Sequence, residues 1–123
     1  MDTDWNRIQA LAQAEIEATL AELPGPLRDQ ARKLPVTFER QPNLGLQGDG
    51  IEADTLGLFT GTDFADGGAG VLPPQIILFL ENLWDYAEGE EQVYADEVRT
   101  TFLHELGHFL GLSEDDLTER GLD

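Results

Sequence analysis

Residues 102–111 read Phe-Leu-His-Glu-Leu-Gly-His-Phe-Leu-Gly, and the architecture of the chain is inferred outward from them. His104 and His108 are the only histidines in the sequence. They stand four residues apart, one turn of a helix, so their imidazoles can converge on one metal ion. Glu105 lies about 100° further round the helix. There it can border the metal without ligating it, as a general base that takes a proton from water must. The stretch therefore predicts a metal site on a helix.

The residues around the histidines predict how that helix is anchored. Leu103, Leu106 and Leu110 form a stripe at spacings of three and four, with Phe102 and Phe109 beside it. Such a stripe is typical of a helix face packed on a core, which leaves the histidines on the opposite, accessible side, towards a cleft. We expect this helix to run from about residue 90 to residue 110, with acidic residues at its start.

The sequence after the second histidine predicts the third ligand and the metal. Gly111 can turn the backbone sharply after the helix end, and Glu114, three residues further on, can return to the metal. Asp115 is the second choice, and Asp116 is expected to serve the first turn of a final short helix capped by Ser113. Two imidazoles and one carboxylate suit zinc better than magnesium or calcium. They also leave the fourth zinc position open for water, the arrangement of a catalytic site.

At these residues the sequence resembles the small bacterial zincin-like metallopeptidases, known as minimal metalloprotease-like domains. The motif is His-Glu-x-x-His-x-x-Gly-x-x-Glu-Asp-Asp over residues 104–116. The resemblance covers roughly residues 35–120 and includes three upstream segments, residues 56–59, 70–73 and 75–79. Metzincins share the frame, but the only methionine is Met1, so their Met-turn is absent. The resemblance implies a compact α+β zincin-like domain with the active helix under a short sheet, and it implies no substrate.

The rest of the chain predicts helices and a short mixed sheet of about three strands. Apolar residues at helical spacing predict an N-terminal helix from Trp5 to Leu23, capped by Asp2 or Thr3, and then a short helix from Pro26 to Lys33. The expected strands are residues 36–39, 56–60 and 75–80. Residues 41–55 and 61–74 are expected to be loops, and residues 81–89 are ambiguous, with one helical turn near Trp84 and Tyr86.

Composition limits the class of protein and its partners. With 123 residues, 41% of them hydrophobic, the chain is expected to form a single domain over residues 1–123. Its net charge of −18 argues against nucleic acid as a partner, and no basic patch offsets it. There is no cysteine, no apolar run long enough for a membrane span and no export signal at the N-terminus, so a cytoplasmic protein is expected.

These observations predict a zinc-dependent hydrolase, with a peptide or protein as substrate and Glu105 as general base. Extended substrates are expected along the edge of strand 75–80, with loop 61–72 as a cleft wall. Two alternatives stay open: a zinc hydrolase of a non-peptide substrate, and a non-catalytic metal-binding interaction module.

Several other features carry weaker signals. The acidic, glycine-containing stretch 63–68 has some character of a calcium loop but lacks the full ligand series, so ordinary loop chemistry is favoured. Tyr86, Tyr94 and Arg99 are each more consistent with a core or solvent-facing position than with a catalytic one.

Overall fold

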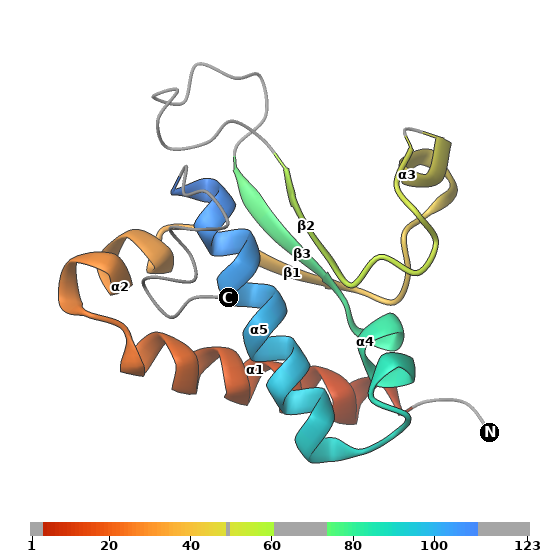
Figure 1. Ribbon diagram of the computed structural model, residues 1–123, viewed down its shortest axis with the longest axis horizontal. Helices are drawn as coiled ribbons and strands as arrows, with labels where there is room; N and C mark the ends of the chain where they lie inside the picture. The colour runs from red at the N-terminus through yellow and green to blue at the C-terminus, as the bar shows by residue number, and fades with distance from the viewer. Residues whose placement is uncertain (1–3, 49, 61–73, 111–123) are drawn as a thin grey trace.

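The computed structural model describes residues 4–48, 50–60 and 74–110, and this part of the chain contains both helices and strands (Figure 1). In chain order they are α1 (Trp5–Glu22), α2 (Gly25–Arg32), β1 (Val36–Glu39), α3 (Leu44–Gly48), β2 (Gly57–Thr60), β3 (Gln75–Phe79), α4 (Leu80–Tyr86) and α5 (Glu91–Phe109). The predicted α+β class is confirmed, and so are the N-terminal helix, the three short strands and the long C-terminal helix.

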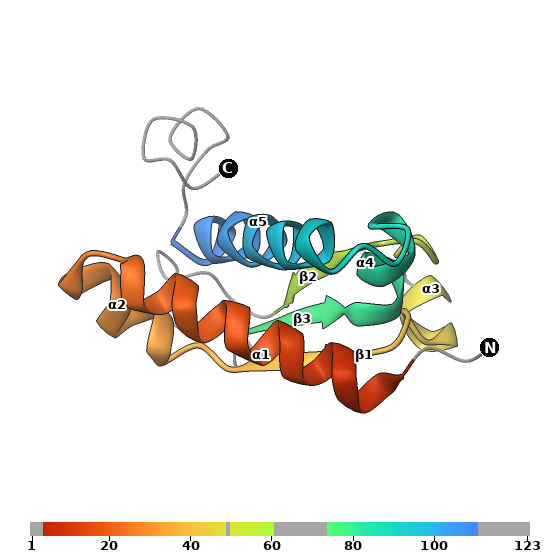
Figure 2. The ribbon, with the colours of Figure 1, turned by 90° about the horizontal axis from the view of Figure 1, so that it is seen from below.

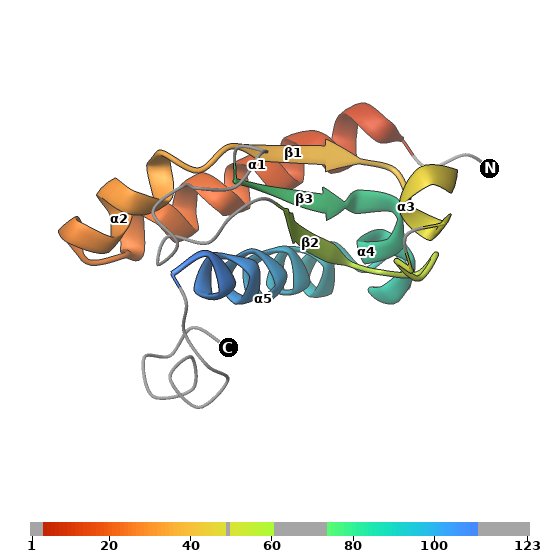
Figure 3. The same cartoon turned by 90° about the horizontal axis from the view of Figure 1, so that it is seen from above.

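The three strands form one mixed sheet in the order β1-β3-β2. β3 lies in the centre, parallel to β1 with Val36 opposite Ile76, and antiparallel to β2 with Gly57 opposite Leu78. Seen from below, α1 and α5 cross in front of the strands, and from above the strands lie in front of both helices (Figures 2 and 3). Both long helices therefore cover the same face of the sheet.

The core lies between this sheet face and the two long helices. Ile76 and Leu78 of β3 are fully buried, together with Ile8 of α1 and Tyr94 of α5. The Tyr94 hydroxyl donates a hydrogen bond of 2.7 Å to the Ile8 carbonyl oxygen, which ties α5 to α1. Burial raises the pKa of the Tyr94 phenol, so the hydroxyl stays protonated and keeps donating.

Charged side chains add surface contacts between the same elements. Arg7 pairs with Glu91, and Arg99 pairs with Glu22, so both ends of α1 are linked to α5. Arg40, just after β1, pairs with Glu81 of α4 and lies 4.7 Å from the centre of the Trp5 ring. Such pairs at the surface contribute little stability each, so the apolar core supplies most of the contact between these elements.

The structure corrects two local predictions and resolves one ambiguous segment. The cap of α1 is Asp4, whose side chain accepts from the Arg7 backbone N–H, and not Asp2 or Thr3. Residues 44–48, predicted as part of a loop, form the single-turn helix α3, whose start is capped by the Asn43 side chain through the Leu46 N–H. The ambiguous segment after β3 is the helix α4, which includes the helical turn expected near Trp84 and Tyr86 and begins at Leu80, the residue predicted to end the strand. In the described ranges no helix has the length and apolar character needed to cross a membrane.

Candidate metal centre

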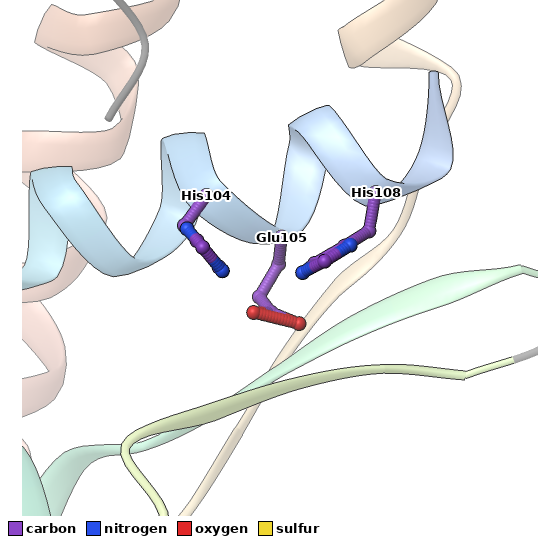
Figure 4. Close-up of side chains that lie close together, drawn as sticks. All are labelled: His104, Glu105 and His108. Carbon is purple, nitrogen blue, oxygen red and sulfur yellow. The ribbon is translucent and has the colours of Figure 1, made fainter. Parts of the chain in front are cut away.

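Helix α5 brings His104, Glu105 and His108 together near its C-terminal end (Figure 4). One nitrogen of each histidine and a carboxylate oxygen of Glu105 all lie within 4.8 Å of one another. The two imidazole rings are 4.7 Å apart between centroids and inclined at 80°. His104 is half-buried and His108 is exposed, and Glu105 is more enclosed than His108. The predicted pair and its neighbouring carboxylate therefore form one cluster, with His108 as its exposed member.

The opposite side of α5 is anchored as predicted. Phe102, Leu103, Leu106 and Phe109 are buried, and Leu110 packs against the core as a partly buried residue. Because these side chains fix the rotation of the helix about its axis, the histidines are held on the accessible side without any contribution from a metal.

Strand β2 is the element of the sheet that faces this cluster. Phe59 packs edge-on against Phe109, with ring centroids 5.8 Å apart. Gly57 approaches Thr101 so closely that a Cβ on the glycine would lie 2.5 Å from the Thr101 Cγ2. At about 100° per residue, Glu105 lies between Thr101 and Phe109 around the helix. Its side chain points towards the strands in Figure 4. Glu105 therefore faces β2, with the histidines beside it.

Sequence reasoning missed the Gly57–Thr101 approach, although a glycine inside a strand is a signal for it. Gly57 stands between two leucines in an otherwise regular apolar strand, and such a glycine often marks a close backbone approach.

We expect Gly57→Ala to destabilise the fold by about 1–3 kcal/mol. The added methyl meets Thr101 at 2.5 Å, Leu78 Cδ2 at 3.2 Å and the Ile77 carbonyl oxygen at 3.4 Å. Thr101 cannot turn away freely, because β-branched side chains in helices have few rotamers. Either β2 or α5 must shift. The free energy of unfolding from urea titration measures the cost.

The matched control is the double variant Gly57→Ala/Thr101→Ser, which removes Cγ2 but keeps the hydroxyl. We expect it to recover at least half of the lost stability, as a coupling energy between two contacting residues. An unchanged stability in the single variant, or no recovery in the double variant, would contradict this contact.

The donor set of the cluster fits zinc. Two imidazoles suit zinc, whereas magnesium and calcium favour shells of oxygen. In a tetrahedral site, two nitrogens about 2.0–2.1 Å from zinc lie roughly 3.3 Å apart. The three donor atoms lie within 4.8 Å of one another, so side-chain rotations would bring the two imidazole nitrogens to that separation. His104 and His108 can thus serve as ligands, with the Glu105 carboxylate beside them.

The other residues considered from the sequence fall into two groups. Glu114, Asp115 and Asp116 lie outside the described residues, as do Gly111, the helix predicted after Ser113, the stretch 63–68 and loop 61–72. The remaining three are described. Tyr94 is in the core, Tyr86 is 62% exposed on α4, and Arg99 is paired with Glu22 at the surface, so none of them belongs to the cluster.

Comparison with known proteins agrees with this geometry. The model of the zincin-like metallopeptidase family matches residues 31–122, which include both histidines and the whole sheet. No curated protein matches the chain. The family match and the His-Glu-His cluster together support a zinc hydrolase in general. Because the match spans most of the sequence, the chain belongs to the zincin-like metallopeptidase family.

Proposed function

We propose that this protein is a zinc-dependent endopeptidase in which His104, His108 and Glu114 hold the metal. Two of these residues belong to the cluster on α5, and the third follows from the spacing of the motif. When bound, zinc lowers the pKa of a water ligand and polarises the carbonyl group of the substrate. The side chains of the protein supply the rest of the chemistry.

Glu105 is the proposed general base. It accepts the proton of the attacking water and delivers it to the amine that leaves when the peptide bond breaks. Its carboxylate is within 4.8 Å of both imidazoles, near enough to hydrogen-bond to a water held between them. It also faces β2, so a substrate lying along that strand would come within its reach.

The observation that carries the proposal is the position of β2 beside the cluster. β3, the strand predicted to receive substrate, is paired on both sides and has no free edge, so that expectation is wrong. β2 is at the edge of the sheet, with no strand on its outer side among the described residues. An extended peptide can add to such an edge through main-chain hydrogen bonds.

The register of the sheet indicates which groups of β2 are available for this pairing. The Phe79 N–H donates to the Leu56 carbonyl at 3.0 Å, so Leu56 and Phe79 form a hydrogen-bonded pair. Along antiparallel strands, hydrogen-bonded pairs alternate with pairs that are not hydrogen-bonded to each other. Leu58 therefore also bonds towards β3, whereas Gly57 and Phe59 direct their N–H and C=O groups to the outer edge of the sheet. Those are the two residues that contact α5 next to the cluster.

Purified protein should bind one zinc ion per chain and cleave members of a peptide library in a chelator-sensitive manner. Elemental analysis and zinc titration measure binding, and mass spectrometry of the digest identifies the cleaved bonds. Metal-free protein that takes up no zinc at micromolar concentration would contradict the site. A zinc-loaded protein that cleaves no peptide would contradict the peptidase.

The same preparation tests the non-catalytic alternative. A metal that holds a module together contributes to folding, so chelation would unfold such a module. Here α5 is anchored by the apolar core on the side away from the histidines. We therefore expect the thermal unfolding midpoint to fall only modestly with chelator, while any hydrolysis is abolished.

A further inference from the structure

A pocket outside the metal cluster opens between α4 and the segment that leads into β2. Its volume is about 560 Å³. The lining residues come from two short stretches of chain: Asp54, Thr55 and Leu56 on one side, and Asn82, Asp85 and Tyr86 of α4 on the other. The volume is within the range of pockets that hold small ligands and exceeds what one long side chain needs.

The two walls of this pocket are fixed to each other. The Asn82 side-chain amide donates hydrogen bonds to the carbonyl oxygens of Ala53 and Thr55, at 2.8 and 2.9 Å. The next residue, Leu56, accepts from Phe79 at the end of β3. The segment before β2 is therefore fastened to both α4 and the sheet, and the pocket is formed before any ligand arrives.

The lining has the chemistry of a site for a cation on an apolar stem. Asp54 and Asp85 supply two carboxylates, and neither has a basic partner among the described residues. Leu56 offers apolar surface, and the Tyr86 ring, 62% exposed, offers a face for cation–π contact. Lysine and arginine side chains combine an aliphatic stem with a positive head. The net charge of −18 would also attract such ligands.

The pocket lies at one end of the β2 edge. Leu56 lines it, and the following residue, Gly57, touches Thr101. His104 is three residues beyond Thr101, about 4.5 Å along α5. Since an extended chain rises about 3.3 Å per residue, a peptide on the β2 edge would reach the pocket roughly two to four residues from the bond at the metal.

We propose that this pocket binds a lysine or arginine side chain of the peptide substrate and so determines sequence preference. The inference rests on the proposed peptidase function, because β2 is taken as the edge that receives substrate. It adds a chemical class of substrate: peptides with a basic residue a few positions to one side of the cleaved bond.

The first experiment measures peptide binding in a variant that is not expected to cleave peptides, so the result does not depend on turnover. Zinc-loaded Glu105→Gln is titrated with labelled peptides that carry lysine at successive positions, each matched by a peptide with norleucine there. We expect one position at which lysine improves affinity at least tenfold. The amide resonances of Asn82 and Tyr86 should shift with the lysine peptide only.

The decisive variant is Asp54→Asn/Asp85→Asn. It should remove the lysine preference and leave the affinity of the norleucine peptide unchanged. The control Asp29→Asn/Asp96→Asn removes the same charge from two exposed positions on α2 and α5 and should keep the preference. Equal losses in both variants would show general charge attraction and overturn the pocket assignment, as would the absence of any lysine preference.

Measuring peptide cleavage distinguishes a failure of the pocket assignment from a failure of the proposed peptidase function. If the unmodified protein cleaves peptides with no basic preference, the pocket assignment fails while the peptidase stands. If lysine peptides bind through Asp54 and Asp85 but zinc-loaded protein never cleaves them, the pocket assignment stands while the peptidase fails.

Discussion

Glu105→Gln is expected to lower peptide hydrolysis by at least about a hundredfold while zinc affinity stays unchanged. The amide keeps the shape and hydrogen-bonding reach of the carboxylate but cannot accept the proton of the attacking water. The histidines on either side of it are untouched, so the two imidazole ligands remain in place. The rate is measured on a peptide from the library digest, and zinc affinity by competition with a chromophoric chelator.

Glu97→Gln is the matched control, since it makes the same change two turns earlier on α5, outside the cluster. It should retain activity. Loss of zinc in Glu105→Gln would show that Glu105 is a ligand and not a base. Unchanged hydrolysis would place the activity elsewhere in the chain or in a contaminant.

Much of the fold could be predicted because its helices are long and periodic. α1 and α5 repeat apolar residues at helical spacing over four turns or more, and their predicted ends agree with the structure within one or two residues. α3 was missed because it has five residues, two of them glycines, and its capping by Asn43 is a local side-chain effect that periodicity does not report.

The cluster was predictable and its surroundings were not. His104, Glu105 and His108 lie within five residues of one helix, so helical geometry alone brings them together. The position of β2 depends on strand order, which joins segments far apart in the sequence. The apolar run of β3 correctly indicated a buried strand, but it did not reveal that β3 pairs with β1 on one edge and β2 on the other, which leaves no edge for substrate. The pocket at Asp54 and Asp85 depends on the same long-range pairing.

Glu114→Ala is expected to weaken zinc binding by a factor on the order of 10–100 or more. A site with two imidazoles needs a third protein ligand to hold zinc and keep one position open. α5 ends at Phe109, one residue after His108, so the chain can turn at Gly111 and return a carboxylate from position 114. The longer side chain of glutamate adds reach. Zinc affinity is measured by competition with the same chelator.

The neighbouring carboxylates make this a test of position and not of charge. Asp116→Ala removes one negative charge two residues away and should leave zinc affinity nearly intact, because Asp116 is expected in the first turn of a helix. Asp115→Ala tests the second choice: a large loss there and none at Glu114 would move the ligand by one residue. In a zinc-bound crystal structure, the Glu114 carboxylate should lie at about 2.0–2.2 Å from the metal. A much longer separation would overturn the assignment even if the affinity of Glu114→Ala had fallen, because loss of a neighbouring support can also weaken a metal site.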